Sequence, residues 1–258
     1  MKRAWCIVPF HRPSDLQNLS ANFIQQTYQN KKLCVIENGS AIGVCKANGF
    51  NPDLLLTASS GPAEAINVAL AELRKIDSSA RGFKIDADDE YRPEYLTEAM
   101  SCADKTGADI VGKGAYFMRM TSGNLWLLGF KENTWGKVPQ GPTLSGIIGN
   151  CEDFPDVKPW GEDAYWCARM IDKGAKVWMS SRYNFCQHRG QKESHTWQVT
   201  DEQIRNLAHG IPCWDIGTYS SDIVDGKSPT QMVPIPSRKL EPEEYPSYLY
   251  AQEQKRIK

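Results

Sequence analysis

Four short apolar runs alternate with amphipathic segments over the first part of this chain. The runs cover residues 4–8, 33–36, 54–57 and 82–85, and each ends at proline, glycine or polar side chains. The clearest segment between them, residues 63–75, carries its apolar side chains at helical spacing. Strands that are separated by helices pair in parallel through right-handed crossovers. The alternation therefore predicts an α/β fold with a central, mostly parallel sheet and flanking helices.

The pattern changes beyond residue 111 and again near residue 200. Residues 112–150 mix aromatic side chains with glycines, which favours a small region of antiparallel strands with long loops. From about residue 200, prolines, charges and isolated aromatics dominate, as expected of a peripheral extension. We therefore divide the chain into a domain of residues 1–199, with halves 1–111 and 112–199, and an extension of residues 200–258.

The bulk composition excludes few functions but indicates a compartment. The 258 residues carry a net charge of −1, so no global basic field points to nucleic acid or to an anionic membrane, although a local patch stays possible. The eight cysteines form no C-x-x-C pair, which is typical of buried thiols in a reducing compartment. The N-terminal apolar run is too short for a signal peptide, and no apolar run reaches the ~18 residues of a membrane span. These features predict a soluble, cytoplasmic protein.

Polar side chains follow three of the predicted strands, at residues 9–12, 37–38 and 86–89. In sheets of this kind, ligands bind beyond the carboxyl ends of the strands, so these clusters predict a binding site. Asp86 and Asp88 would point to the same side just past a strand end, and two carboxylates suit a divalent cation, which in turn suits a diphosphate. The alternative is a solvated acidic turn in which Asp89 caps the following helix.

Four sequence blocks, in order, resemble the family 2 glycosyltransferases of the GT-A fold. They begin with CIVPFHRPSDLQNLSANFIQQTYQNKKLCVIENGS, continue with GPAEAINVALAEL and GFKIDADDEYRPEYL, and end with WGEDAYWCARMIDKGAKVWMSSRYNFCQHR. The likeness covers roughly residues 4–197. It implies a GT-A, Rossmann-like sheet, a nucleotide-sugar donor and a divalent metal ion.

The resemblance assigns the catalytic and metal roles. It implies that Asp163 is the general base and that Glu162 positions the donor sugar or the acceptor. Asp88 would bind Mn²⁺ or Mg²⁺, with Asp86 near the ribose or the metal, and His188 would add a metal or diphosphate contact. Two alternatives stay open: the acidic pair could only complement a helix N-terminus, and His188 could be a surface histidine.

The same resemblance assigns the nucleotide pocket. Glu37 would contact the nucleoside at a position where the family commonly has aspartate, so the charge is kept on a longer side chain. His195 is a further candidate for contact with the diphosphate, with ordinary packing as the alternative. The other implied positions are Pro9, His11, Arg12, Asn38 and Asn67.

The expected activity is metal-dependent, inverting transfer of a hexosyl group from a UDP-sugar to an acceptor hydroxyl. The acceptor would be a glycan or, as a hypothesis prompted by the lysines and arginines of residues 238–258, a hydroxymethylated pyrimidine in viral DNA. A nucleotidyltransferase is one alternative, but it would need a glycine-rich loop after the first strand, and residues 9–16 contain no glycine. A catalytically inactive nucleotide-sugar binding module is another.

Overall fold

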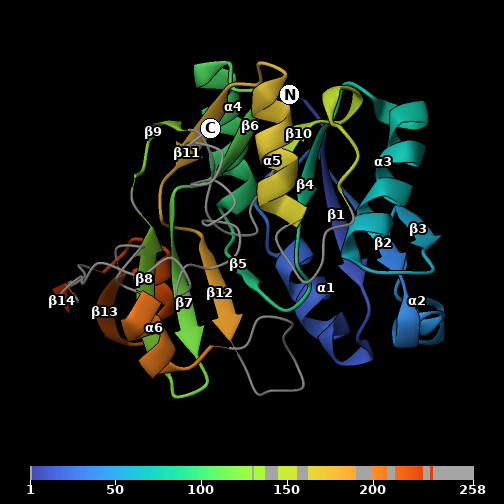
Figure 1. Cartoon of the computed structure of the whole chain (residues 1–258). Helices are drawn as coiled ribbons and strands as arrows, with labels where there is room; N and C mark the ends of the chain where they lie inside the picture. Colours follow the sequence, from blue (N-terminus) through green and yellow to red (C-terminus); the bar gives the residue numbers. More distant parts are fainter. Residues whose placement is uncertain are drawn as a thin grey trace.

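The computed structural model describes residues 2–129, 131–136, 145–155, 162–189, 199–207, 213–228 and 233–234. Its centre is an eight-stranded sheet between two layers of helices (Figure 1). The strands lie in the spatial order β3 (Leu54–Thr57), β2 (Lys31–Glu37), β1 (Ala4–Phe10), β4 (Arg81–Lys84), β10 (Ser145–Ile147), β6 (Ile110–Lys113), β11 (Val177–Ser180) and β9 (Thr134–Gly136).

The sheet is mostly parallel, as the alternation of strands and helices predicts. Strands β3, β2, β1 and β4 are mutually parallel, and so are β6 and β11. Strand β10 runs antiparallel to both β4 and β6 and joins the two parallel groups, while β9 closes the far edge in the antiparallel sense. The predicted α/β class is therefore confirmed.

Helices cover both faces of this sheet because its strands are apolar on both sides. In β1, Cys6 and Val8 pack in one apolar cluster with α1 (Leu16–Ile24) and α4 (Tyr95–Thr106). Trp5 and Ile7 alternate with them and pack in a second cluster with α3 (Pro62–Asp77) and α5 (Glu162–Asp172). The short α2 (Val44–Ala47) follows β2, and short 3₁₀ segments lie at residues 13–15, 39–41 and 148–150.

A second, six-stranded sheet adjoins the first. Most of its neighbouring strands are antiparallel, as expected for this region, although β7 (Ala115–Met120) and β12 (Phe185–Arg189) pair in parallel. Strand β13 (Cys213–Thr218) lies within residues 200–258 and pairs with β8 (Asn124–Gly129), so this part of the predicted extension belongs to the sheet. The order is β14 (Val233–Pro234), β13 (Cys213–Thr218), β8 (Asn124–Gly129), β7 (Ala115–Met120), β12 (Phe185–Arg189) and β5 (Glu90–Tyr91), with α6 (Asp201–Leu207) and α7 (Ser221–Val224) beside it.

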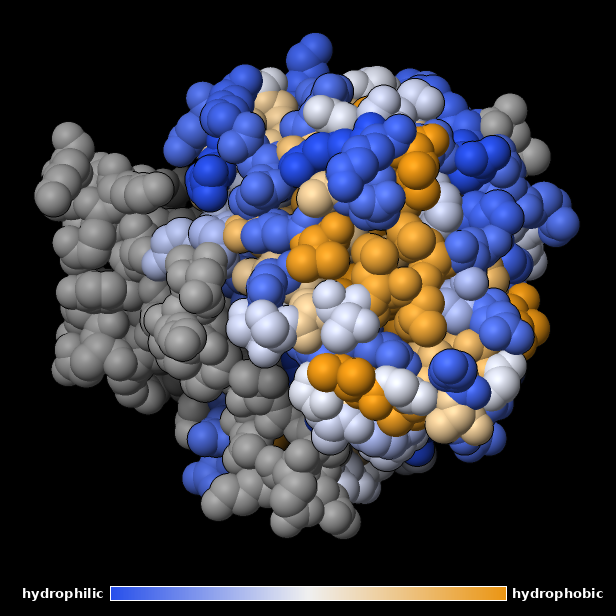
Figure 2. All heavy atoms as spheres, turned by 90° about the vertical axis from the view of Figure 1, so that its right-hand side faces the viewer, coloured by the Kyte–Doolittle hydropathy of each residue, from blue (hydrophilic) through white to orange (hydrophobic). Residues whose placement is uncertain are grey.

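A broad apolar area lies on the outer face of the molecule. Figure 2 shows it on the side that carries the sheet edge β3 with α2 and α3. Ile42, Leu55 and Ile76 are among the large apolar side chains that stay exposed. A hollow between α1 and residues 42–50 is lined by apolar and uncharged polar side chains only, so it lacks the groups that acid–base or metal chemistry needs. Within the described residues, no helix is both long and apolar enough to span a membrane.

Candidate active site

The polar segments that follow β1, β2 and β4 meet at one edge of the large sheet. Arg12, just after β1, donates from Nη2 to Oδ2 of Asp88, after β4, at 2.7 Å. Asn38, just after β2, donates its backbone N–H to the carbonyl oxygen of Phe10 at 2.9 Å. Because the three strands are parallel, their carboxyl ends lie together. The predicted convergence of these segments is therefore present.

A buried lysine joins the aspartate turn to helix α5. Lys84, the last residue of β4, donates from Nζ to both oxygens of Asp86, at 2.8 and 3.1 Å, and to Oδ2 of Asp163 at 3.1 Å. Its side chain is only 5% exposed. Burial lowers the pKa of Lys84, but the carboxylates of Asp163 and Asp86 outweigh it and hold this pKa well above its ordinary value. Lys84 therefore stays charged and brings the two carboxylates together.

Asp163 has the properties of a proton acceptor near neutral pH. It lies in the first turn of α5 beside the half-buried Glu162. Burial raises the pKa of Asp163 to about 7, even though Lys84 acts in the opposite direction. Its Oδ2 is bound by Lys84, whereas its Oδ1 is buried and has no hydrogen-bond partner within the described part of the chain. A buried, unsatisfied carboxylate oxygen is costly unless a ligand donates to it.

Two aspartates of the turn after β4 face different basic side chains. Asp86 faces Lys84 and Asp88 faces Arg12, whose Nε also donates to Asp15 at 2.8 Å. The donor set of Asp86 and Asp88 consists of hard carboxylate oxygens, which fits Mn²⁺ or Mg²⁺. A cation bound there would compete with the two basic side chains for these oxygens.

Asp89 serves the architecture of the turn. It is 1% exposed, accepts the backbone N–H of His188 at 2.9 Å and pairs with Arg189 at 3.6 Å. Burial and the neighbouring Asp88 raise its pKa well above the ordinary value. Helix α4 begins only at Tyr95, so the alternative that Asp89 caps this helix is wrong. Asp89 instead fastens the turn to β12.

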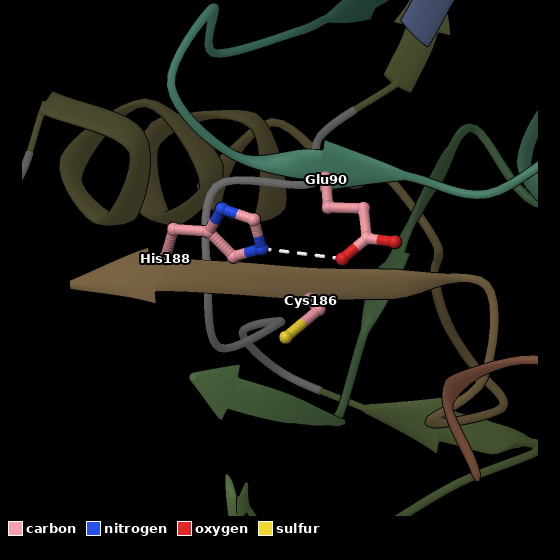
Figure 3. Close-up of side chains that lie close together, drawn as sticks. All are labelled: Glu90, Cys186 and His188. Carbon is pink, nitrogen blue, oxygen red and sulfur yellow. Dashed lines mark hydrogen bonds and ion pairs between the residues drawn. The ribbon is translucent and has the colours of Figure 1, made fainter. Parts of the chain in front are cut away.

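The imidazole of His188 points to Glu90 rather than being held by the aspartates of the turn. Its Nε2 lies 3.2 Å from Oε2 of Glu90, and Cys186 completes the group (Figure 3). His188 is thus close to the turn through its backbone, while its ring belongs to the pair of strands β5 and β12.

Two of the predicted nucleotide contacts are engaged in local structure. Glu37 is 3% exposed and accepts the backbone N–H groups of Gly43 and Cys45, at 2.8 and 2.7 Å, around the start of α2. Burial raises the pKa of Glu37, but these hydrogen bonds outweigh it and the net shift is downward. Asn67 uses both ends of its amide on the backbone of Phe154, at 2.9 and 2.6 Å.

The other predicted nucleotide positions lie closer to the sheet edge. Pro9 is buried in β1 opposite Ile36. His11 follows β1, and burial together with Arg12 lowers its pKa. Asn38 donates from Nδ2 to the carbonyl oxygen of Ser60 at 2.7 Å. Its Oδ1 is buried and finds no partner among the described residues, so it is available to a donor group on a ligand. His195 lies outside the described residues.

Two further groups of residues shape the site and were not anticipated. Lys84 was visible in the sequence as a lysine inside a buried apolar run, which is rare unless the charge is paired. The second group lies on α1, where Asn18 donates to the carbonyl oxygens of Ala87 and Asp89, at 2.6 and 2.9 Å, and Asn22 donates to that of Asp89 at 2.8 Å. Their four-residue spacing places both amides on one side of the helix, which was the available signal.

Solved structures show the same fold, whereas comparisons by sequence find nothing. No protein-family model matches the chain, and no curated protein matches it. TarS 1–349 of S. aureus in complex with UDP-GlcNAc superposes with a TM-score of 0.56 at 17% identity, over 80% of this chain and 64% of that one. The mannosyltransferase PcManGT of Pyrobaculum calidifontis, in complex with GDP-Man and Mn²⁺, gives a TM-score of 0.56 at 15% identity, over 81% of this chain and 61% of that one.

This chain thus spans less than two thirds of either structure. At such low identity the likeness speaks for the fold alone. The order of strands, the two layers of helices and these superpositions together show that the chain shares the mixed α/β fold of these two structures.

Proposed function

We propose that this protein is a metal-dependent glycosyltransferase that moves a hexosyl group from a UDP-sugar to an acceptor hydroxyl with inversion. The observation that carries the proposal is the Lys84 bridge between Asp86 and Asp163. It links a carboxylate of the donor-side turn to a second carboxylate whose pKa is about 7 and whose Oδ1 is unpartnered within the described residues. Transfer of a sugar to a hydroxyl needs these two functions side by side.

Asp163 would act as the general base. In a single displacement, the acceptor oxygen attacks the anomeric carbon from the face opposite the leaving group, which inverts the configuration. The new C–O bond forms while the bond to the diphosphate breaks, and its electron pair leaves with UDP. The hydroxyl proton passes to Oδ1 of Asp163, and a pKa near the working pH suits this transfer. Glu162, beside it on α5, would position the acceptor or the donor sugar.

Asp88, with Asp86 beside it, would hold Mn²⁺ or Mg²⁺. When bound, such an ion stabilises the negative charge that develops on the departing diphosphate. Arg12 already lies at Asp88, so on donor binding its guanidinium is placed to exchange this carboxylate for a phosphate oxygen. Lys84 would hold Asp163 through Oδ2 and thereby keep Oδ1 directed to the acceptor.

The nucleoside would bind along the ends of β1 and β2. Pro9, His11 and Asn38 are the candidates there, and Oδ1 of Asn38 can accept a hydrogen bond from the base or the ribose. Glu37 would support this pocket through the α2 segment, because its carboxylate is taken by backbone N–H groups. Asn67 would act equally indirectly, by holding the backbone at Phe154.

UDP is the proposed nucleotide, and the solved structures give a reason to test a second one. TarS was crystallised with UDP-GlcNAc and PcManGT with GDP-Man and Mn²⁺. For the acceptor we propose a glycan, with hydroxymethylated pyrimidine in DNA as the second candidate. The basic residues that prompt the second candidate lie outside the described residues. Affinity for duplex DNA that does not fall steeply with salt would remove it.

A panel of UDP- and GDP-sugars tests the function. The unfolding temperature is measured with each donor, with and without Mn²⁺, and release of the nucleoside diphosphate is then followed with and without candidate acceptors. We expect at least one donor to raise the unfolding temperature only when Mn²⁺ is present, as ligand linkage requires, and to be consumed slowly by water or faster by an acceptor. If no nucleotide sugar binds or reacts, the proposal is wrong.

A further inference from the structure

The strands β5 and β12 bring three metal-ligating side chains together. Cys186 of β12 is the direct antiparallel partner of Glu90 of β5. His188 lies two residues beyond Cys186, and side chains two apart in a strand point to the same face. Figure 3 shows the imidazole of His188 facing the carboxylate of Glu90, with the side chain of Cys186 close by on β12. A cysteine and a histidine spaced C-x-H on a strand, with a carboxylate on the neighbouring strand, form a mixed S, N and O donor set.

The distance between the nitrogen and oxygen donor atoms is close to what a tetrahedral ion requires, and the sulfur lies nearby. Zn²⁺ binds nitrogen, oxygen and sulfur at ~2.0–2.3 Å, which places neighbouring ligand atoms of a tetrahedral site about 3.3–3.6 Å apart. Nε2 of His188 and Oε2 of Glu90 are 3.2 Å apart, and all three donor atoms lie within 4.8 Å of one another.

The carboxylate of Glu90 accepts hydrogen bonds from neighbouring side chains, as metal-binding carboxylates commonly do. The hydroxyl of Tyr219 donates to Glu90, at 2.8 Å from Oε1 and 2.7 Å from Oε2. Arg92 donates to Oε1 at 2.9 Å and to Asp225 at 2.6 and 3.0 Å, and Lys227 pairs with the same Asp225 at 2.8 Å. Arg92 thus contacts Oε1 of Glu90, whereas His188 faces Oε2.

We propose that Glu90, Cys186 and His188 bind one thiophilic transition-metal ion, Zn²⁺ in the first place, with the fourth position open to water. The ion would clamp β5 to β12, immediately beyond the aspartate turn. On binding, the Cys186 S–H bond breaks, the proton goes to solvent and the sulfur electron pair goes to the metal.

This site differs in chemistry from the carboxylates of Asp86 and Asp88. Those offer only hard oxygens and suit Mn²⁺ or Mg²⁺, whereas a thiolate with an imidazole selects zinc, and cobalt as its spectroscopic substitute. The proposal assigns the ring of His188 to the second centre and does not depend on glycosyl transfer. A failure of either proposal leaves the other standing.

Cobalt binding tests the proposal without any activity measurement. Reduced, chelator-treated full-length protein is titrated with Co²⁺ in excess Mg²⁺, which occupies the hard-oxygen site, and the near-ultraviolet thiolate-to-cobalt band is recorded. We expect one equivalent of Co²⁺ to produce this band together with visible bands of tetrahedral intensity, and Zn²⁺ to displace it. Zn²⁺ should also raise the unfolding temperature of the reduced protein.

Matched variants locate the site. Cys186→Ser should abolish the thiolate band, and Cys213→Ser, at another buried cysteine of the same sheet, should retain it. Asp88→Asn should also retain it. Tyr219→Phe should weaken binding about 10–100-fold, as loss of an outer-shell partner does. If Cys186→Ser does not fold, the titration of the wild type still tests the proposal. Cobalt bound without a thiolate band, or no cobalt bound in excess Mg²⁺, would overturn it. An undiminished band in folded Cys186→Ser would overturn it as well.

Discussion

Replacing Lys84 by methionine would leave Asp86 and Asp163 without the cation that lies between them. Breaking a buried ion pair by removing one partner costs about 3–5 kcal/mol. The carboxylate side chains keep 26% and 23% of their surface exposed, so we take the lower end, about 3 kcal/mol at neutral pH. For a chain of this size, that is a fall of roughly 6–12 °C in unfolding temperature.

The loss should depend on pH in a defined direction. In the folded wild type the pKa of Asp163 is about 7, and removing the positive charge of Lys84 raises it further. Between the unfolded pKa of ~3.9 and the raised folded value, the folded state binds more protons than the unfolded state. Stability therefore falls as pH rises through this window, and the variant should be closer to wild type at pH ~5 than at pH ~8. Chemical unfolding at both pH values measures this.

Lys113→Met is the matched control. Lys113 is also buried, 2% exposed, and pairs with Glu98 at 2.8 Å, away from Asp86 and Asp163. The Lys113→Met protein should lose comparable stability. Lys84→Met, unlike Lys113→Met, should also move the acidic limb of the pH–rate profile to higher pH, because Lys84 contacts Asp163 and Lys113 does not. A Lys84→Met protein with wild-type stability and an unmoved limb would refute this reasoning.

Three further outcomes follow from the same geometry. The wild-type kcat/KM should rise with pH through about 7 as Asp163 ionises, and a profile that is flat across this range would count against its role as base. Asn67→Ala should lower the free energy of unfolding by about 1–3 kcal/mol, because the backbone groups of Phe154 lose their hydrogen-bond partners. The KM for the donor should stay unchanged, and a raised KM with full stability would mean that Asn67 contacts the donor directly. Asp88→Asn should remove the Mn²⁺-dependent part of the rise in unfolding temperature that the donor causes. The fold should persist, since the amide oxygen can still accept from Arg12. An unchanged dependence on Mn²⁺ would mean that the metal binds at another site.

Local patterns predicted the parallel half of the fold well. The strand expected at residues 54–57 is β3, and the helix expected at residues 63–75 lies within α3, because each carries its own hydrophobic period. The antiparallel β10 gave no such signal. Its three residues, Ser145–Ile147, contain one large apolar side chain and are strand only because β4 and β6 flank them. A strand of three residues is too short to show a hydrophobic period, so its pairing with distant strands could not be predicted from the sequence.

In the candidate site, too, the features formed by neighbouring residues were predictable and those formed by distant residues were not. The aspartate turn and the acidic start of α5 were recognisable because their residues are neighbours in the sequence. The bridge through Lys84 joins residues 79 positions apart, and the group around His188 joins residues 98 apart, so neither could be read from spacing. Glu37 carries the charge that suggested a nucleoside contact, but nearby N–H groups of the chain itself take up its carboxylate.

Comparison of Asp163→Asn with the wild type tests the central claim most directly. The asparagine is nearly the same size, so the variant should bind the nucleotide sugar with Mn²⁺ as the wild type does, as judged by calorimetry. Its transfer rate at saturating donor should fall about 10²–10⁴-fold, because the amide of asparagine cannot take the hydroxyl proton. Unimpaired transfer by a folded Asp163→Asn protein would contradict the account.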